Sequence, residues 1–138
     1  MKAGARLIQI LILLCLVIAS AWSAEPRGAI VPLDRDGVQR QDIAVDSYFF
    51  TPSHLIVKVD LPVELFFTSA AWLLSHNFVL KSLEGGLDIE QEIPAWSTAK
   101  IRFTPTRVGA YSFSCTKRLP FSSSHEELGM VGTLEVVR

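Results

Sequence analysis

The sequence predicts an all-β protein, a Greek-key β-sandwich preceded by an N-terminal signal-peptide helix. Short runs of β-branched and aromatic residues alternate between apolar and polar positions, and turn residues separate them. No helical period is found beyond the N-terminal region, and no segment repeats itself. The chain of 138 residues is 49% apolar and 20% charged, which fits one globular domain.

The N-terminal residues 1–24 have the pattern of a secretory signal peptide. An apolar run covers residues 7–18 (LIQILILLCLVI), with Lys2 and Arg6 before it and Ala19-Ser20-Ala21 after it. The run is shorter than the roughly 20 residues that cross a bilayer comfortably. We therefore expect cleavage and a periplasmic or secreted protein, and the alternative is an uncleaved membrane anchor.

The mature chain is predicted to open with a leader and then three strands. Residues 25–42 are rich in proline, glycine and aspartate, which indicates a polar leader segment that ends in a turn. The run 43–50 (IAVDSYFF) is aromatic and β-branched, and Thr51-Pro52-Ser53 ends it. Apolar residues alternate over 55–59 and 63–67, so each of these segments is expected to bury one face.

Four more strands are expected before the C-terminus. Alternation or β-type composition predicts them over 76–80, 99–103, 111–115 and 132–137, with glycine or proline turns between several of them. Residues 43–138 would thus form a single sandwich domain.

Charge and cysteine content narrow the functional classes. The formal net charge is −1, which argues against a nucleic-acid binder that neutralises phosphates. Cys15 lies in the signal peptide, so Cys115 is the one cysteine of the mature chain. An exported protein with one cysteine has no internal disulfide, and Cys115 is either buried and inert, paired between molecules, or bound to a metal.

Four residues form a candidate metal site: His76, Cys115, His125 and Met130. Two imidazoles, a thiolate and a weak thioether match a trigonal copper site with a long axial sulfur. Cys115 ends a predicted strand, and the spacing C-x9-H-x4-M lets one loop carry three of the four. Each residue alone is more often an ordinary core or surface residue, so the prediction depends on the set.

Three stretches resemble the signature segments of the cupredoxins, the small type 1 blue-copper proteins that include plastocyanin and azurin. They are HNFVL from His76, VGAYSFSC ending at Cys115 and HEELGMVGTLEV from His125; the resemblance spans about residues 43–138. It implies one copper ion per chain, held by His76 through Nδ1, the Cys115 thiolate, His125 and axial Met130.

The resemblance also implies a supporting contact around the copper ligands. Asn77 would hydrogen-bond Thr116, the residue that follows the cysteine, and so hold the ligand loop still. Phe78 and Tyr111 would be core residues of the sandwich. The ligand loop 116–124 is longer than in plastocyanin-like relatives and nearer in length to that of copper nitrite reductase domains.

The implied function is a periplasmic one-electron carrier that docks transiently with a cytochrome or another copper protein. Three strong ligands and one weak ligand leave no open position for a substrate, so we expect no enzymatic activity. The alternative is copper binding, trafficking or tolerance in the same compartment. A nitrite-reductase-like enzyme is disfavoured, because a second histidine cluster is missing from the sequence. We expect no nucleic-acid partner, and a membrane contact only if the N-terminal segment is retained.

Several residues around the predicted site have two interpretations each. Trp72 with Leu73 and Leu74 could be an apolar docking rim or a buried loop anchor. Lys117 and Arg118 could steer an anionic partner or keep the loop soluble. The acidic residues Asp88, Glu90 and Glu92 are expected to form a solvated strand face. His54 is expected at the surface, and Trp96 is expected to be packed in the core or against a loop.

Overall fold

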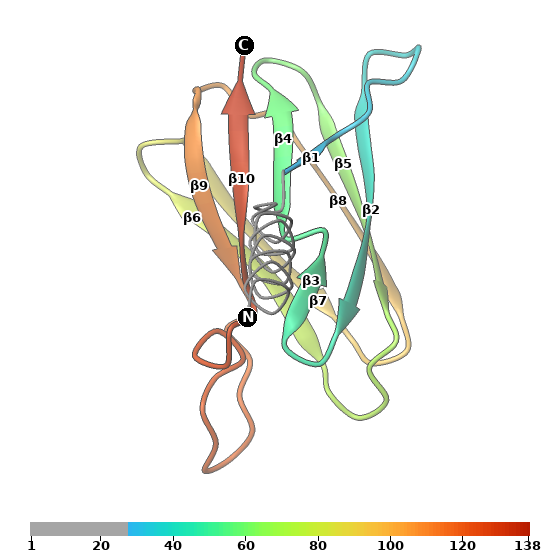
Figure 1. The fold of residues 1–138 in the computed structure, drawn as a ribbon, viewed down its shortest axis with the longest axis vertical. Coiled ribbons are helices and arrows are strands. Elements are labelled where there is room, and N and C mark those ends of the chain that lie inside the picture. The colour runs from blue at the N-terminus through green and yellow to red at the C-terminus, as the bar shows by residue number, and fades with distance from the viewer. Residues whose placement is uncertain (1–27) are drawn as a thin grey trace, which may run out of the picture.

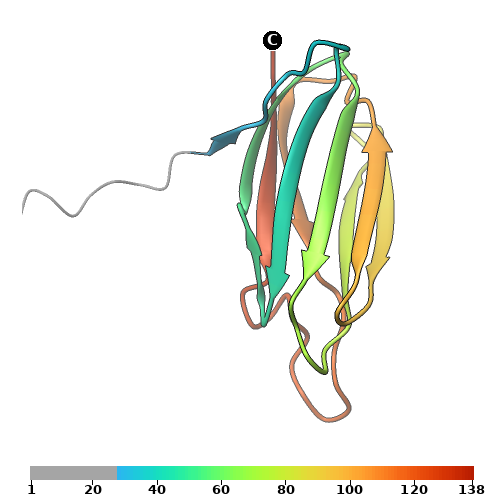
Figure 2. The same ribbon diagram turned by 90° about the vertical axis from the view of Figure 1, so that its right-hand side faces the viewer.

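The computed structural model describes residues 28–138 as two β-sheets packed face to face (Figures 1 and 2). The predicted signal peptide 1–24 and the first residues of the leader lie outside the described residues. Between residues 28 and 138, no helix is long and apolar enough to cross a membrane. The all-β sandwich predicted from the sequence is confirmed.

The larger sheet has six strands in the order β1-β4-β10-β9-β6-β7. β4 pairs in parallel with both β1 and β10, whereas β10–β9, β9–β6 and β6–β7 are antiparallel. The strand bounds are β1 Ala29–Ile30, β4 His54–Lys58, β6 His76–Ser82, β7 Leu87–Ile93, β9 Gly109–Ser114 and β10 Val131–Val137.

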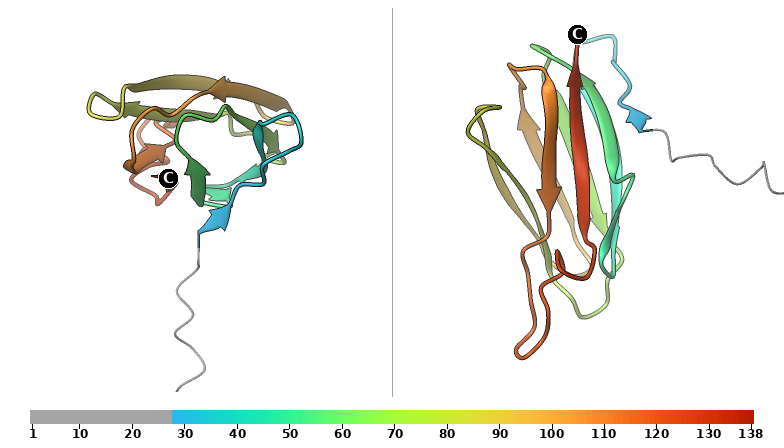
Figure 3. Two further views of the ribbon diagram at one scale, coloured as in Figure 1. Left: turned by 90° about the horizontal axis from the view of Figure 1, so that it is seen from above. Right: turned by 60° about the vertical axis from the view of Figure 1, so that its left-hand side comes forward.

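The smaller sheet has four strands in the order β3-β2-β5-β8. β2 pairs in parallel with β5, and β3 and β8 add antiparallel strands at the two edges. The strand bounds are β2 Gln39–Asp46, β3 Phe49–Thr51, β5 Val63–Ser69 and β8 Thr98–Phe103. Viewed from above, the two sheets enclose the core between them (Figure 3).

The core is built by the alternation that the sequence predicts, since every second residue of a strand points inward. Phe78, completely buried on β6, lies at its centre. Its ring centroid is 4.8 Å from that of Phe113, 5.1 Å from that of Phe67 and 6.1 Å from that of Phe50. Burying one such ring contributes about 1.5–3 kcal/mol. Tyr111 is also buried, as expected.

The N-terminal boundary of the sandwich lies earlier than residue 43. β1 and the start of β2 fall within 25–42, the segment interpreted as a leader. Gln39 is buried, and its amide bridges the backbone of Lys58: Nε2 donates to the Lys58 carbonyl at 3.0 Å and Oε1 accepts from the Lys58 N–H at 2.6 Å. A buried polar side chain that is hydrogen-bonded to the backbone does not contribute to an apolar alternation, so the sequence pattern does not indicate the start of β2.

The predicted strand 43–50 is in fact a hairpin. β2 ends at Asp46 and β3 begins at Phe49, which faces Asp46 across the ladder. The two-residue turn Ser47-Tyr48 lacks the glycine or asparagine that favours such turns, so the sequence does not announce it. Tyr48 takes a left-handed backbone conformation with φ of 67°.

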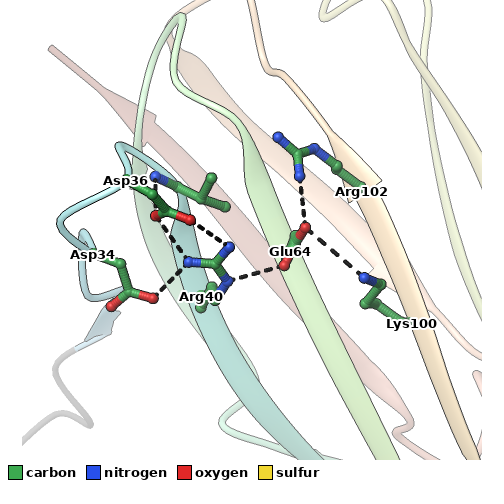
Figure 4. A network of polar contacts seen from close by, with 7 residues as sticks. Asp34, Asp36, Arg40, Glu64, Lys100 and Arg102 are labelled. Atoms are coloured by element: carbon green, nitrogen blue, oxygen red, sulfur yellow. Dashed lines mark hydrogen bonds and ion pairs between the residues drawn. The ribbon is translucent and has the colours of Figure 1, made fainter.

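An ion-pair network fixes the end of the sandwich opposite His76 (Figure 4). Arg40 on β2 contacts Asp34 at 2.7 Å, Asp36 at 2.8 Å and the buried Glu64 of β5 at 2.9 Å. Arg102 of β8 approaches Glu64 at 2.7 Å from the other side. The hydrogen bond from Arg40 lowers the pKa of Asp36 to about 2 and also lowers the pKa of Glu64. The network connects the β1–β2 loop to three strands of the smaller sheet, β2, β5 and β8.

Candidate metal centre

The candidate donors come from three strands that meet at one end of the larger sheet. His76 is the first residue of β6, Cys115 directly follows β9, and Met130 directly precedes β10. β9 lies between β10 and β6, because Ser114 pairs with Val131 on one side and with Val79 on the other. The β9–β10 connection, which carries His125, projects from this end (Figures 1 and 3).

His76, Cys115 and His125 converge on one point. The Cys115 Sγ lies 3.4 Å from the His125 Nδ1 and 3.8 Å from the His76 Nδ1, and the two Nδ1 atoms are 3.2 Å apart. Relative exposure is 0% for His76 and Cys115 and 2% for His125, so the donors are shielded and His125 is the nearest to solvent. The geometry presents two imidazole nitrogens and one sulfur to a common position.

Burial governs the protonation of all three donors. Desolvation lowers the pKa of His76 to about 4, and the neighbouring His125 adds to this effect. Burial also lowers the pKa of His125 and raises the pKa of the Cys115 thiol. At neutral pH without metal, both imidazoles are therefore neutral and ready to bind, whereas the thiol keeps its proton.

Met130 is completely buried and is tied to the donors through the backbone. Its N–H donates to the His125 carbonyl at 2.8 Å, and its own carbonyl accepts from the Cys115 N–H at 3.0 Å. The His125 N–H donates in turn to the Lys117 carbonyl at 2.8 Å. These bonds hold the segments that carry Cys115, His125 and Met130 in one arrangement.

Two reciprocal hydrogen bonds between Ser124 and Glu127 stabilise the turn around His125. The Ser124 N–H donates to Glu127 Oε2 at 2.6 Å, and the Glu127 N–H donates to Ser124 Oγ at 3.2 Å. The bond from the Ser124 backbone lowers the pKa of the Glu127 carboxyl. This exchange orients the residues on both sides of His125.

Asn77 contacts the residues around the cysteine from the neighbouring strand. Its N–H donates to the Cys115 Sγ at 3.4 Å, a contact that would offset part of the negative charge once the thiol loses its proton to a metal. Its side chain exchanges two hydrogen bonds with Thr116, Nδ2 to Oγ1 at 2.9 Å and Thr116 N–H to Oδ1 at 2.8 Å. The Asn77–Thr116 contact that the family resemblance implies is therefore present.

The donor chemistry fits a single copper ion. One thiolate and two imidazoles are soft or borderline ligands, and copper prefers this mixture when a weak thioether completes it. The second ring nitrogen of His76, Nε2, is buried without a hydrogen-bond partner, so Nδ1 is the nitrogen that faces the other donors. Among residues 28–138, this is the one cluster of histidine, cysteine and carboxylate groups close enough to hold a metal.

Comparison with known proteins gives structural matches alone. No protein-family model matches the sequence, and neither does any curated protein. The metal-binding domain of the Cu(I)-exporting P-type ATPase CopA of Streptococcus pneumoniae D39 superposes with a TM-score of 0.60, at 21% identity over 83% of this chain and 100% of that chain. Reduced auracyanin of Roseiflexus castenholzii superposes with a TM-score of 0.59, at 16% identity over 72% of this chain and 97% of that chain. Auracyanin A of Chloroflexus aurantiacus, described as a blue copper protein, superposes with a TM-score of 0.57, at 19% identity over 73% of this chain and 100% of that chain.

The chain has a cupredoxin fold. The blue copper proteins that share this fold have low sequence identity to this chain, so the evidence for the metal site comes from the residues of this chain itself. These residues are two histidines, one cysteine and a neighbouring buried methionine.

Sequence reasoning missed one contact of this cupredoxin-fold site. The ring of Tyr48 meets the His125 ring edge to face, with centroids 5.1 Å apart and an interplanar angle of 77°. Tyr48 lies in the β2–β3 turn, inside a segment that reads as a continuous strand. A turn residue of this kind has no spacing relationship to the histidine, so no pattern could indicate the contact.

The structure decides part of the alternatives left open around the site. Trp72 and Leu73 are 72% and 76% exposed, which excludes a buried loop anchor for these two, whereas Leu74 is half-buried. Trp96 was expected to be packed, but it is 67% exposed, because it stands at a left-handed turn between β7 and β8. Lys117 pairs with Glu92 at 2.7 Å, and Arg118 pairs with Glu127 at 3.3 Å.

The remaining polar residues lie where the sequence predicts or close to it. Asp88, Glu90 and Glu92 are exposed along β7, the edge strand of the larger sheet, as a solvated strand face requires. His54 begins β4 and does not lie in a turn, although it is partly exposed as expected; its Nε2 lies 2.9 Å from Glu135.

Proposed function

We propose that this protein is an exported, periplasmic one-electron carrier with one mononuclear type 1 copper ion. The observation that carries the proposal is the convergence of His76 Nδ1, Cys115 Sγ and His125 Nδ1 in a buried cluster. A copper ion bound there would supply the redox chemistry, since it can alternate between Cu(I) and Cu(II).

Enclosure of the donors supports electron transfer and not catalysis. His76, Cys115 and Met130 are completely buried, and His125 is nearly so. Enzymatic metal sites usually keep an open coordination position for water or substrate. The buried donors here leave little room for such an open position. Because the donor atoms are already close together without metal, little rearrangement is needed when the ion changes its charge.

The surrounding residues have separable roles in this proposal. The Cys115 thiolate supplies the strongest bond, and the Asn77 N–H at 3.4 Å offsets part of its negative charge. The edge of His125, the most exposed donor, is the proposed route for electrons. Met130 would supply the fourth and weakest donor, since it is buried and its backbone is hydrogen-bonded to His125 and Cys115.

The proposed partner is a cytochrome or another copper protein that docks briefly around His125. A carrier must release its partner quickly, and such contacts use small interfaces. The exposed side chains of Trp72 and Leu73 support docking at this end of the sandwich. Export is proposed from the N-terminal signal-peptide pattern alone.

An optical titration tests the copper site. Cu(II) added to the metal-free protein should give intense visible absorption from thiolate-to-copper charge transfer, and it should saturate at one ion per chain. Cys115→Ser should abolish the band, whereas Ser112→Ala, at an exposed position of the preceding strand β9, should keep it. A colourless loaded protein, or a band that survives in Cys115→Ser, would overturn the proposed site.

Copper delivery is the second candidate function. The structural similarity to the metal-binding domain of a Cu(I)-exporting ATPase supports it, as does the length of the loop 116–124. Electron self-exchange, measured by nuclear magnetic resonance on mixtures of the two oxidation states, separates the candidates. Fast exchange supports the carrier, and slow exchange with rapid copper transfer to a chelator supports delivery.

A further inference from the structure

Three aromatic residues occupy left-handed backbone positions, which bulky side chains rarely adopt. The φ angles are 67° for Tyr48, 52° for Trp96 and 61° for Phe121. Glycine, asparagine or aspartate is favoured at such positions, and an aromatic residue there costs folding free energy. The one other non-glycine residue with positive φ between residues 28 and 138 is Asp60, which tolerates it.

All three aromatic turns lie at the metal end of the sandwich. Tyr48 contacts His125 directly. Trp96 follows β7, whose last residue Ile93 pairs with His76, and Phe121 lies on the loop between Cys115 and His125. Figures 1 and 2 show the β5–β6, β7–β8 and β9–β10 loops projecting from this same end.

Two of these aromatic rings face solvent. Phe121 is completely exposed at the tip of a narrow loop that the Arg118–Ser124 bridge closes, and Trp96 is largely exposed. Trp72 and Leu73 on the β5–β6 loop and Leu119 on the β9–β10 loop are also large, apolar and exposed. We define the aromatic tip as the set Trp72, Leu73, Trp96, Leu119 and Phe121. Strain together with exposure indicates that Phe121 serves binding and not folding.

The charges around the aromatic tip point to the chemistry of its partner. Lys117 and Arg118, the cations of the ligand loop, are each paired with a carboxylate, of Glu92 and Glu127 respectively. Glu126, next to His125, is exposed and has no ion pair within residues 28–138. The five charged side chains just named sum to −1, and residues 28–138 as a whole carry −3, ten basic against thirteen acidic residues. A net acidic surface suits a cationic protein better than an anionic lipid surface.

We propose that the aromatic tip, with Phe121 as its anchor, docks into an apolar hollow of a redox protein whose rim carries lysine and arginine side chains. This inference rests on the proposed function and specifies its partner. Insertion of Phe121 would place the partner's redox centre next to the His125 edge, because the two residues share one loop. Aromatic anchors that fill a pocket contribute most of the energy of many interfaces.

The test compares Phe121→Asn with Leu83→Asn in the copper-loaded protein. Leu83 is also completely exposed, but it follows β6 at the opposite end of the sandwich, so it is a matched control. The probe is a c-type cytochrome whose haem edge is ringed by lysines, and the readout is the second-order rate of electron transfer in stopped flow. Ferricyanide, which needs no docking surface, provides the reference rate for each variant.

We expect Phe121→Asn to lower the ratio of cytochrome rate to ferricyanide rate about tenfold, and Leu83→Asn to leave this ratio unchanged. Added salt should slow the cytochrome reaction of the unmodified protein. Phe121→Asn should also raise thermal stability, since asparagine tolerates the left-handed turn better than phenylalanine. A stability loss would instead show that Phe121 packs within its own chain, which overturns its role as an anchor.

Other outcomes would overturn the inference and leave the proposed function standing. These are an unchanged rate ratio in Phe121→Asn, a rate that rises with salt, binding to anionic phospholipid vesicles that Phe121→Asn abolishes, or a dimer in sedimentation that Phe121→Asn dissociates. Failure to reduce ferricyanide at all would instead overturn the carrier function itself.

Discussion

Asn77 and Thr116 exchange two hydrogen bonds between neighbouring strands, with donor–acceptor distances of 2.9 and 2.8 Å. Asn77 directly follows His76, and Thr116 directly follows Cys115. The exchange therefore joins the residues next to two of the donors, so that the spacing of the donor atoms is maintained without metal. A site arranged in this way needs little change in geometry on binding.

Removal of this exchange should destabilise the metal-free protein. We expect Asn77→Ala to lower the free energy of unfolding by about 1–3 kcal/mol, because a buried amide is lost and its partners are left unpaired. Thr116→Val, which removes the hydroxyl and keeps the backbone bond, should cost less. Urea denaturation measures both values, and Asn77→Ala equal in stability to the unmodified protein would contradict the assignment.

The fold could be predicted because apolar and polar residues alternate along its strands. Leu55 and Val57 or Leu134 and Val136 repeat every second residue, and the structure buries each of them. The Tyr48 turn and the Gln39 strand could not be predicted in this way. One depends on a backbone angle and the other on side-chain bonds to a distant backbone, and neither leaves a local pattern.

The donor cluster was foreseeable for a different reason. Cys115 and Met130 flank one loop that also carries His125, so sequence spacing alone brings these three near one sheet end. His76 required the strand order, because β9 separates β10 from β6. The exposure of Trp96 was not foreseeable, since it depends on which way a strained turn points.

Copper binding should release one proton per chain at pH 7. Burial raises the pKa of the Cys115 thiol, so this group is protonated in the metal-free protein, whereas the lowered pKa values of His76 and His125 leave both imidazoles neutral. The thiolate is the form that binds, so its proton must leave.

Calorimetric titration in buffers of different ionisation enthalpy measures this proton count. The slope of the observed enthalpy against the buffer enthalpy should correspond to one proton. A slope near zero would mean that Cys115 is already a thiolate, and a slope near two would mean that one histidine is protonated at pH 7. Cys115→Ser supplies the control, because its slope should fall towards zero wherever residual binding is measurable.

Stability of the metal-free protein should decline in mild acid because of His76. Its pKa is about 4 in the folded protein, below the ordinary value of 6.5 expected when unfolded. Between these values the unfolded chain binds the proton and the folded chain does not, so stability falls as the pH drops from 6.5 and levels off below 4. A shift of this size corresponds to about 3 kcal/mol.

Denaturant unfolding at a series of pH values checks this effect, with His76→Gln as the comparison. The variant should lose most of the slope between pH 4 and 6.5. His125→Gln is a useful second comparison, because burial lowers the pKa of His125 as well. If His76→Gln retains the full slope and His125→Gln removes it, the acid sensitivity belongs to His125.

Tyr48 should stabilise the orientation of His125 through its ring. The two rings meet edge to face with centroids 5.1 Å apart, a contact worth about 0.5–1.5 kcal/mol beyond burial. Tyr48→Leu should therefore lower the free energy of unfolding of the metal-free protein and speed the loss of copper to a chelator. Tyr48→Phe, which keeps the ring, should behave like the unmodified protein.

A double-mutant cycle isolates this contact from the strain at Tyr48. The cycle combines Tyr48→Leu with His125→Ala and measures unfolding of the metal-free variants in urea. Both Tyr48→Leu and Tyr48→Phe keep a bulky residue at a φ of 67°, so the backbone strain is similar in each. A coupling energy near zero would show that the rings are neighbours without mutual stabilisation. His125 would then owe its orientation to its backbone bonds with Lys117 and Met130 and to the Ser124–Glu127 exchange.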